Sequence, residues 1–258
     1  MIEKTEAVVL KSIKYGDTSR IVTLYTREFG KMSVIAKGAR AAKSRFGAAL
    51  DVMSRSDIVL YRKEHRELQL LSQADLLQQY KKLIADPPRL MAGFAVLEFT
   101  HAAVQGEEAH EELYELLTSA LARLDESRED ALITLLRFLI GLTHALGIGF
   151  DMLHCINCRT ALSEAGALRD RAAFSIAHGG CTCSSCTPKA DSFRIDLGTV
   201  QLLQVLRPSA EIPSVNPDTP HRITQEGVYL LHKHLSAHID GMRRVKSMRL
   251  LDAFDEGR

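Results

Sequence analysis

The sequence has 258 residues, of which 46% are hydrophobic and 25% charged, with a formal net charge of +1. A chain of this length can bury a substantial core without disulfides and has room for two domains. No apolar run reaches the roughly 18 residues of a membrane span, and the charges of Glu3, Lys4 and Glu6 interrupt the N-terminus. We therefore expect neither a membrane helix nor a secretory signal, and a cytoplasmic protein whose thiols stay reduced.

Charge is distributed unevenly along the chain. Residues 1–82 carry 16 Lys or Arg against 9 Asp or Glu, a balance of +7, whereas residues 83–130 carry 3 against 11, a balance of −8. A basic segment followed by an acidic one suggests a face that binds a polyanion, joined to a surface with another partner. Solvated charges that are unevenly spread by chance would give the same pattern.

The first 75 residues predict five short β-strands. The strands are expected at 7–10, 21–25, 32–36, 57–61 and 68–71, where β-branched and aromatic residues are frequent. Turn residues lie at 15–17 and 29–31, and a longer connection runs from Gly38 to Gly47. Five strands in so short a segment fit a closed barrel, because an open sheet would leave its edges unprotected. We expect an OB-type barrel within a domain of residues 1–80; an SH3-like barrel fits the same pattern.

Basic residues dominate the third strand and the long connection, since no acidic residue occurs between Glu28 and Asp51. Flexible cations there could follow a phosphate backbone and release its counterions. The predicted DNA-binding residues are Lys11, Arg20, Lys31, Lys37, Arg40, Lys43 and Arg45. A solvated loop is the alternative. A second basic group, at 243–249, either takes part in binding or only covers an exposed helix face.

Aromatic residues that could stack on bases are sparse in the barrel. The candidates are Tyr15, Tyr25, Phe29, Phe46 and Tyr61. Most of them are expected in the core of so small a barrel. Because no tryptophan and no base-reading pattern is visible, we expect binding to be largely independent of sequence.

From Asp86 onward the apolar spacing becomes helical, and residues 81–258 predict a mainly α-helical domain. Apolar residues recur every three to four positions over 90–101 and 113–124. A third helix is predicted to begin at Ser127, with Asp130 three residues later as in a capping box, and to end near Gly147 and Gly149. A short helix is expected over 197–206 and a final helix over 224–254.

All five cysteines lie between Cys155 and Cys186. The pairs Cys155/Cys158 and Cys183/Cys186 can each form a tight turn, and two such turns complete a tetrahedral all-sulfur site that leaves no position for water. We predict one structural Zn²⁺ per chain, held within a segment of residues 151–190. Cys181 could replace Cys183, because Gly179 and Gly180 permit a sharp turn. A redox dithiol and inert buried thiols are the alternatives.

Catalytic signatures are missing from the sequence. His154 and His178 are weaker candidate metal ligands, and His234 and His238 share a helix face without a third ligand. The stretch 65–67 fits the His-x-Glu of zinc deaminases, but neither cysteine pair follows a proline. No phosphate loop, dinucleotide fingerprint or Gly-x-Ser-x-Gly elbow is present. We predict no catalytic residue and no enzyme activity; a zinc enzyme would need an open coordination position.

Both ends of the chain resemble the RecO family of DNA recombination and repair mediators. The resemblance rests on two segments, VVLKSIKYGDTSRIVTLYTREFGKMSVIAKGAR near the start and LHKHLSAHIDGMRRVKSMRLLDAF near the end. The resemblance implies an N-terminal OB domain, a helical domain and a zinc site inserted in it. The family zinc pattern maps onto Cys155, Cys158, Cys183 and Cys186, with Cys181 as an extra cysteine.

The resemblance also implies a function. A member of this family is expected to bind single- and double-stranded DNA, to anneal complementary strands and to associate with the bacterial nucleoid during repair. With RecR it is expected to load recombinase onto DNA coated by single-strand binding protein. The alternative is a zinc-containing interaction scaffold whose acidic helices around Glu107–Glu115 recruit a basic partner, with DNA binding incidental.

Overall fold

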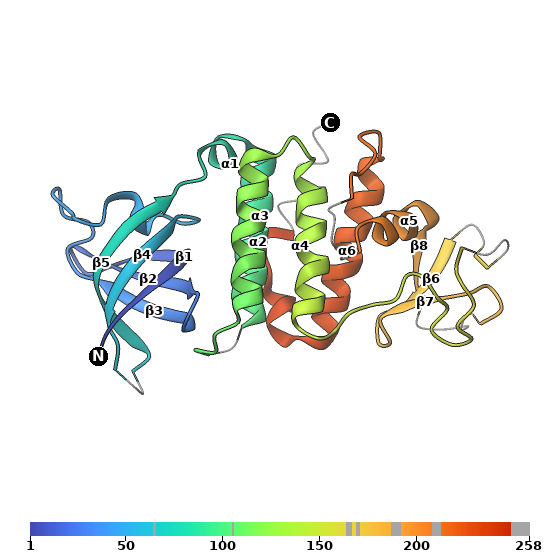
Figure 1. Cartoon of the computed structure of the whole chain (residues 1–258), viewed down its shortest axis with the longest axis horizontal. Coiled ribbons are helices and arrows are strands. Elements are labelled where there is room, and N and C mark those ends of the chain that lie inside the picture. Colours follow the sequence, from blue (N-terminus) through green and yellow to red (C-terminus); the bar gives the residue numbers. More distant parts are fainter. Residues whose placement is uncertain are drawn as a thin grey trace. The chain divides into compact units, whose positions relative to one another are not determined.

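The chain folds into two compact units. The computed structural model describes residues 1–63, 66–104, 106–163, 167–168, 171–186, 192–207 and 213–248. One unit is Met1–Ser127 with the segment that begins at Val245, and the other is Arg128–Arg244 (Figure 1). None of the helices in these described ranges is long and apolar enough to cross a membrane.

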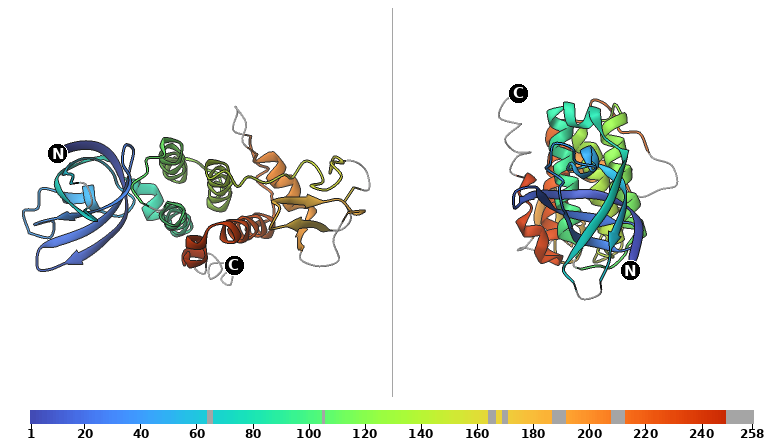
Figure 2. Two further views of the ribbon diagram at one scale, coloured as in Figure 1. Left: turned by 90° about the horizontal axis from the view of Figure 1, so that it is seen from below. Right: turned by 90° about the vertical axis from the view of Figure 1, so that its left-hand side faces the viewer.

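The first unit begins with a closed five-stranded barrel. Its strands are β1 (Ile2–Tyr15), β2 (Ser19–Thr26), β3 (Gly30–Ala36), β4 (Arg55–Tyr61) and β5 (Leu68–Gln78). They close in the order β1-β2-β3-β5-β4, with β3 and β5 parallel and the other pairs antiparallel (Figure 2). The predicted OB-type barrel and its five strands are confirmed. Each strand is longer than its apolar run, because pairing continues into polar residues at the strand ends.

Alternate side chains along each strand point inward and fill the barrel core. Val22, Leu24 and Val34 point inward with no exposed surface, and so do Ile58 and Leu60. The short 3₁₀ helix η1 (Gly47–Leu50) adds buried side chains to the same core. Burying each such aliphatic side chain contributes about 1.5–3 kcal/mol, so the barrel has the core that its strand pattern predicts.

Three helices complete the described part of the first unit: α1 (Lys81–Ala85), α2 (Pro87–Ala103) and α3 (Glu111–Glu126). Asp86 caps α2, because its carboxylate accepts from the N–H of Arg89 at 3.2 Å. Against the barrel, the Tyr25 and Tyr114 rings stack with centroids 6.4 Å apart. The Tyr114 hydroxyl also donates to Glu6 Oε2 at 3.2 Å. Apolar and polar contacts therefore both hold α3 on the barrel.

The second unit combines helices with a small sheet. Its helices are α4 (Ala131–Ala145), α5 (Leu197–Val205) and α6 (His221–His238), followed by the 3₁₀ helix η2 (Asp240–Arg244). Strands β6 (Arg171–Ser175), β7 (Gly180–Thr182) and β8 (Phe193–Asp196) form an antiparallel sheet in the order β7-β6-β8. The sequence pattern did not predict this sheet, whose strands are three to five residues long.

The predicted start of the third helix at Ser127 is wrong. Ser127 ends α3, where its N–H donates to the Arg123 carbonyl, and α4 begins only at Ala131. Asp130 is the residue that caps α4, since its Oδ1 accepts from the N–H groups of Leu132 and Ile133 at 2.8 and 3.4 Å. A carboxylate satisfies these free donors without help from a preceding serine.

The predicted final helix is also too long. It ends at His238, where Ile239 adopts extended dihedral angles, and η2 follows. The chain then joins the first unit, because the Glu98 carboxylate accepts from the N–H groups of Lys246 and Ser247, both at 2.8 Å. Residues 247–248 are helical again, so these two donors lie at the start of a separate helical segment. Residues 249–254 of the predicted helix, including Arg249 of the second basic group, lie outside the described residues.

Candidate metal centre and nucleic-acid interface

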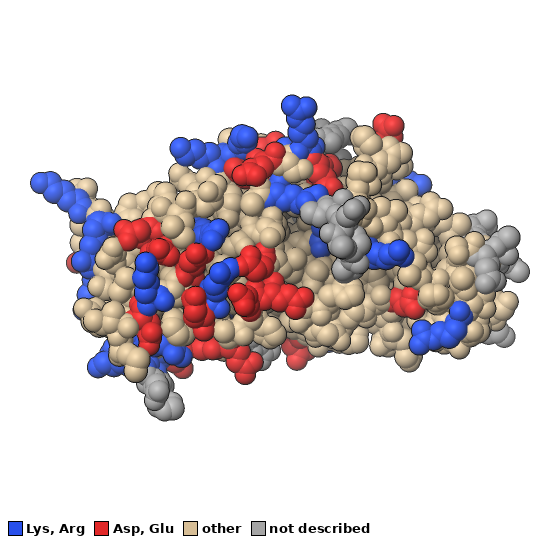
Figure 3. Space-filling model, viewed as in Figure 1, with Lys and Arg blue, Asp and Glu red and all other residues tan. Residues whose placement is uncertain are grey.

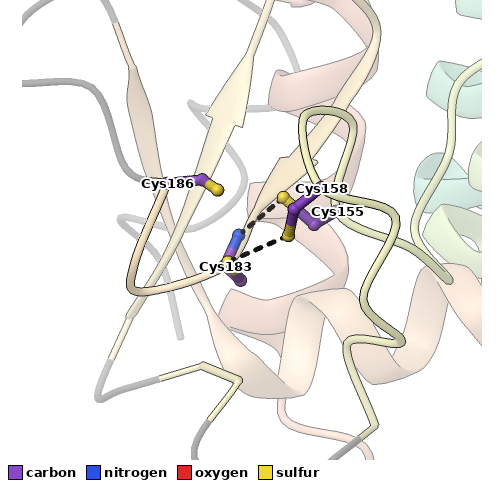
Figure 4. Close-up of side chains that lie close together, drawn as sticks. All are labelled: Cys155, Cys158, Cys183 and Cys186. Carbon is purple, nitrogen blue, oxygen red and sulfur yellow. Dashed lines mark hydrogen bonds between the residues drawn. The ribbon is translucent and has the colours of Figure 1, made fainter.

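The two cysteine pairs lie on two turns that face each other (Figure 4). In the first turn, the N–H of Arg159 donates to the Cys155 carbonyl and the N–H of Cys155 donates to the Thr160 carbonyl, both at 2.9 Å. The second turn follows β7 and is closed by the N–H of Cys186, which donates to the Cys183 carbonyl at 3.0 Å. Each Cys-x-x-Cys spacing therefore forms the local turn that it predicts.

Two glycines let these turns approach each other. Gly179 has φ +62°, a left-handed conformation that other residues rarely adopt. A Cβ atom on Gly180 would lie 2.4 Å from Cγ2 of Ile156 and 2.8 Å from the Asp151 carbonyl oxygen. The glycine pair thus packs the β6–β7 connection directly against the first cysteine turn.

The four paired cysteines are positioned to hold one metal ion. The sulfurs of Cys155, Cys158, Cys183 and Cys186 all lie within 4.8 Å of one another. Those of Cys158 and Cys183 are 3.6 Å apart, close to the about 3.8 Å of a tetrahedral site with Zn–S bonds of about 2.3 Å. Four thiolates are a donor set typical of Zn²⁺ or iron–sulfur centres.

The electrostatics of the cluster also suit a cation. The Thr160 hydroxyl, 3.3 Å from the Cys158 sulfur, lowers the pKa of Cys158 to about 6. Hydrogen bonding to the sulfurs of Cys158 and Cys183 raises the pKa of Cys186 to about 12. Four thiols this close cannot all ionise by themselves, whereas a bound cation favours deprotonation of all four.

Cys181 lies apart from the cluster. It is on β7, has no exposed surface, and its sulfur is 3.5 Å from the Met152 sulfur. Burial raises the pKa of Cys181 to about 12. The alternative in which Cys181 replaces Cys183 therefore does not fit the geometry, since β7 directs Cys181 into the core of the second unit.

The candidate histidines have other contacts. His154 Nδ1 is 3.7 Å from Asp151 Oδ2, and His178 Nδ1 is 3.0 Å from the Ser175 hydroxyl. His234 is buried with both ring nitrogens at backbone carbonyls, and His238 Nε2 is 3.3 Å from the Ile176 carbonyl. Within the described ranges, the four cysteines are the one group of metal-ligating side chains found together. His65, of the deaminase-like stretch, lies outside those ranges.

The basic connection between β3 and β4 folds onto the turn between β1 and β2. The N–H of Arg40 donates to the Thr18 carbonyl at 2.8 Å, and its guanidinium donates to the Gly16 carbonyl at 3.2 Å. Lys37 and Lys43 are exposed, and Arg45 lies over the Phe46 ring. We call residues 37–45 the basic loop. The backbone of this loop lies at one end of the barrel, away from α2 and α3 (Figures 1 and 2).

The other three predicted DNA-binding residues have different surroundings. Lys11 is exposed on β1, and Arg20 pairs with Asp51 at 3.3 Å. Lys31 donates to the carbonyls of His101 and Val104 at the C-terminal end of α2, where a cation is favoured. Burial there lowers the pKa of Lys31. The structure therefore brings Lys31 to a helix end and not to the basic loop.

Two of the five candidate aromatic residues are exposed. Tyr15 is 53% and Tyr61 45% exposed, whereas Tyr25 and Phe46 are buried. Phe29 packs against the barrel core, and Arg62 lies over its ring. Tyr25 is buried against Tyr114 of α3 and not in the barrel core. The expectation that most of the five belong to the barrel core is therefore wrong, since it holds only for Phe46 and Phe29, and Tyr15 and Tyr61 are the exposed ones.

Acidic residues of the segment 83–130 pair with the barrel. Glu107 lies 3.0 Å from Arg62, and Glu115 forms an ion pair with Arg27. On the face drawn in Figure 3, acidic side chains gather over the part of the first unit between the barrel and α3, and basic ones project from the far end of the barrel. Some acidic residues of the segment 83–130 are thus neutralised by basic residues of the barrel within the first unit.

Together these features define a protein that joins an OB-like barrel with a basic loop to a helical unit with a four-cysteine metal centre. Residues 1–80 match the family model for the N-terminal part of recombination protein O, and residues 84–249 match that for its C-terminal part. The chain belongs to the RecO family of DNA repair proteins, and the resemblance seen in the sequence is confirmed.

Individual relatives agree with this assignment, and each bears the name DNA repair protein RecO. That of Chloroherpeton thalassium is 34% identical over 70% of each chain. That of Rhodopirellula baltica is 32% identical over 83% of this chain and 77% of its own. The similarity to the protein of Prosthecochloris aestuarii, 28% identical, extends over 97% of each chain.

Proposed function

We propose that this protein is a recombination mediator that binds single- and double-stranded DNA largely without sequence specificity and anneals complementary strands. The observation that carries the proposal is the basic loop. Arg40 fixes this loop on the β1–β2 turn of an OB-like barrel, and the chain belongs to the RecO family. DNA repair requires contact with DNA, and OB barrels bind oligonucleotides through their strand face and connecting loops.

The basic loop would act on the phosphate backbone. Lys37, Lys43 and Arg45 are exposed, and no acidic residue occurs between Glu28 and Asp51 to oppose them. Contacts to phosphates carry no sequence information. A cationic surface reduces the repulsion between two polyanions and raises their local concentration, so annealing needs no catalytic residue.

The remaining assignments follow from this function. Residues 1–80 are the DNA-binding domain, and residues 81–258 are the helical domain with its metal-binding segment at 151–190. The metal is one structural Zn²⁺, held by Cys155, Cys158, Cys183 and Cys186, because four thiolates close the coordination sphere. When bound, it would hold the two cysteine turns together and supply folding energy.

The partners are proposed on the family assignment. With RecR, the protein loads recombinase onto single-stranded DNA coated by single-strand binding protein, and it works at the nucleoid. The scaffold alternative is less favoured, since Glu107 and Glu115 of the acidic segment already pair with Arg62 and Arg27.

A strand-annealing assay tests the proposal. Complementary oligonucleotides coated with single-strand binding protein are mixed with wild-type protein, with or without RecR, and with two double variants. Lys37→Ala/Lys43→Ala should slow annealing, whereas Lys81→Ala/Lys82→Ala removes the same charge from exposed positions on α1 and should not. Wild-type protein that leaves the annealing rate unchanged would contradict the proposed function.

A further inference from the structure

Lys31 lines a cavity of the first unit that the proposed function does not use. The cavity has a volume of about 600 Å³, which lies within the range of about 300–1,000 Å³ for small-molecule sites. Ser33 of β3 and Thr23 of β2, which lie opposite each other in register, line it as well. His101 of α2 and Arg66 are also part of its wall. An amine, an imidazole, a guanidinium and two hydroxyls therefore share one space that is large enough for a sugar.

The contacts of the Lys31 amine leave one position of its nitrogen free. Nζ donates to the carbonyl of His101 at 2.8 Å and to that of Val104. These two bonds occupy two of the three positions around Nζ that its carbon leaves, and the third can hold a lone pair. No carboxylate in the described part of the chain pairs with Lys31, and Glu107 of the cavity pairs with Arg62. The two carbonyls accept from an uncharged amine as they do from an ammonium.

The surroundings favour that uncharged amine. Burial lowers the pKa of Lys31, because water no longer fully stabilises the ammonium. Lysines that are desolvated or lie beside another cation are those that form Schiff bases with carbonyl compounds, and Arg66 lines the same cavity. Burial and the charges of Lys31 and Lys11 lower the pKa of His101. Its imidazole is therefore uncharged at pH 7 and can accept a proton.

We propose that Lys31 captures the aldehyde of an abasic site in DNA as a Schiff base. This inference rests on the proposed function and adds a class of damaged DNA to its substrates. A deoxyribose that has lost its base opens and exposes an aldehyde at C1′. Without a base it is also small enough to enter the cavity, whereas an intact nucleotide offers no carbonyl carbon on its sugar.

The capture needs no oxidant or reductant. The lone pair of Nζ adds to the C1′ carbonyl carbon, the carbonyl oxygen gains a proton, and His101 can accept the proton that the nitrogen loses. The resulting carbinolamine then loses water as the C=N bond forms. Water reverses the step, so the adduct would hold the protein at the damaged site without consuming the lesion.

Lys31 lies within reach of DNA that the basic loop holds. It is the second residue of β3, and the basic loop begins at Lys37, six residues later. At about 3.3 Å per residue, the strand between them spans about 20 Å. One DNA strand covers this distance with about six nucleotides at about 3.4 Å each, and OB folds bind about 4–16 nucleotides. Arg66, which is exposed, can pair with a phosphate beside the abasic sugar.

Borohydride trapping tests the capture, because hydride reduces the C=N bond to a stable secondary amine. The full-length protein is mixed with an oligonucleotide that carries one abasic site, at a protein concentration that saturates the DNA. Sodium borohydride should then yield a covalent adduct on a denaturing gel, and mass spectrometry of its peptides should place the DNA on Lys31. The same oligonucleotide with an intact base should yield no adduct.

A matched pair of variants separates Lys31 from other lysines. Lys31→Arg keeps the positive charge and can still donate to both carbonyls, but a guanidinium forms no Schiff base. It should reduce trapping at saturating protein at least about tenfold. Lys81→Arg makes the same substitution at an exposed position of α1 and should trap as the wild type does. Thermal melting checks that both variants fold.

The outcomes keep this inference apart from the proposed function. If the wild type binds the oligonucleotide but yields no adduct, or yields it mainly at other lysines, the inference is wrong and the proposed function stands. If propanal with borohydride modifies Lys31 and abasic DNA does not, the amine is reactive but DNA is not its substrate, and the inference is again wrong. If the wild type binds no DNA, both proposals fail. Should Lys31→Arg not fold, the peptide map of the wild-type adduct decides alone.

Discussion

The backbone N–H of Cys183 donates a hydrogen bond to the sulfur of Cys155 at 3.3 Å (Figure 4). This contact joins the two cysteine turns across 28 residues of sequence. Burial opposes ionisation of Cys155, but the N–H groups of Cys158 and Cys183 outweigh it and lower the pKa of this thiol. The second turn therefore supports the Cys155 thiolate of the first turn, and the metal-binding segment should fold as one unit with its ion.

Replacing Cys181 and Cys183 by serine should separate the core cysteine from the metal-binding one. Cys181→Ser places a hydroxyl in the core and should cost about 1–3 kcal/mol of stability, yet retain one zinc per chain. Cys183→Ser removes one of the four clustered sulfurs and should lose the zinc or bind it weakly. Metal content by mass spectrometry measures both variants. The reverse result would show that the ligand choice is wrong although a metal site exists.

Adding a single methyl group at Gly180 should disturb the metal centre. The new Cβ would meet Ile156 at 2.4 Å and the Asp151 carbonyl at 2.8 Å, so the cysteine turns must move apart. We expect Gly180→Ala to lose about 1–3 kcal/mol and to weaken zinc binding in a chelator competition. Gly149→Ala is the control, because its Cβ would meet only His144, at an ordinary 3.7 Å. Equal zinc affinity for the two variants would contradict this role of Gly180.

The contact of the barrel with α3 should depend on pH through Glu6. Burial opposes ionisation of Glu6, but hydrogen bonds and charge from Arg55 outweigh it and lower its pKa below the ordinary 4.5. A carboxyl with a lowered pKa stabilises the fold above its ordinary pKa, and this contribution is lost as the pH falls through the lowered value. Glu6→Gln should therefore cost about 1 kcal/mol at pH 7, and this cost should shrink as the pH falls below 4.5.

Urea unfolding of the wild type and Glu6→Gln between pH 3 and 8 measures this difference. Glu3→Gln removes the same charge from the same strand and serves as the control. A cost of Glu6→Gln that is the same at pH 3 and pH 7 would show that Glu6 acts through packing and not through its charge.

Much of the fold could be predicted because local patterns decide it. β-Branched runs gave the five strands, and the number of strands in a short segment gave barrel closure. The equal spacing of the two cysteine pairs was sufficient to choose Cys183 over Cys181 as the partner of Cys186. In contrast, β6, β7 and β8 were missed because strands of three to five residues beside a metal-binding segment carry little apolar periodicity.

The outward face of β1 could be predicted only in part, because it depends on a β-bulge. Ala7 and Val9 point into the core, but the bulge between Val9 and Lys11 shifts the alternation, so Ile13 and Tyr15 face outward. A periodic pattern read straight through β1 gives the opposite face. The contacts of Lys31 could not be predicted from the sequence either, since its partners His101 and Val104 are 70 or more positions away.

The salt dependence of DNA affinity tests the central claim, that the basic loop binds the phosphate backbone. The logarithm of Kd should rise linearly with the logarithm of salt concentration for the wild type. For duplex DNA, Lys37→Ala/Lys43→Ala should lower the slope by about 1.8, since each lost phosphate contact removes about 0.9. Lys81→Ala/Lys82→Ala should keep the wild-type slope. A wild-type affinity that barely responds to salt, or a slope unchanged by loss of Lys37 and Lys43, would contradict the account.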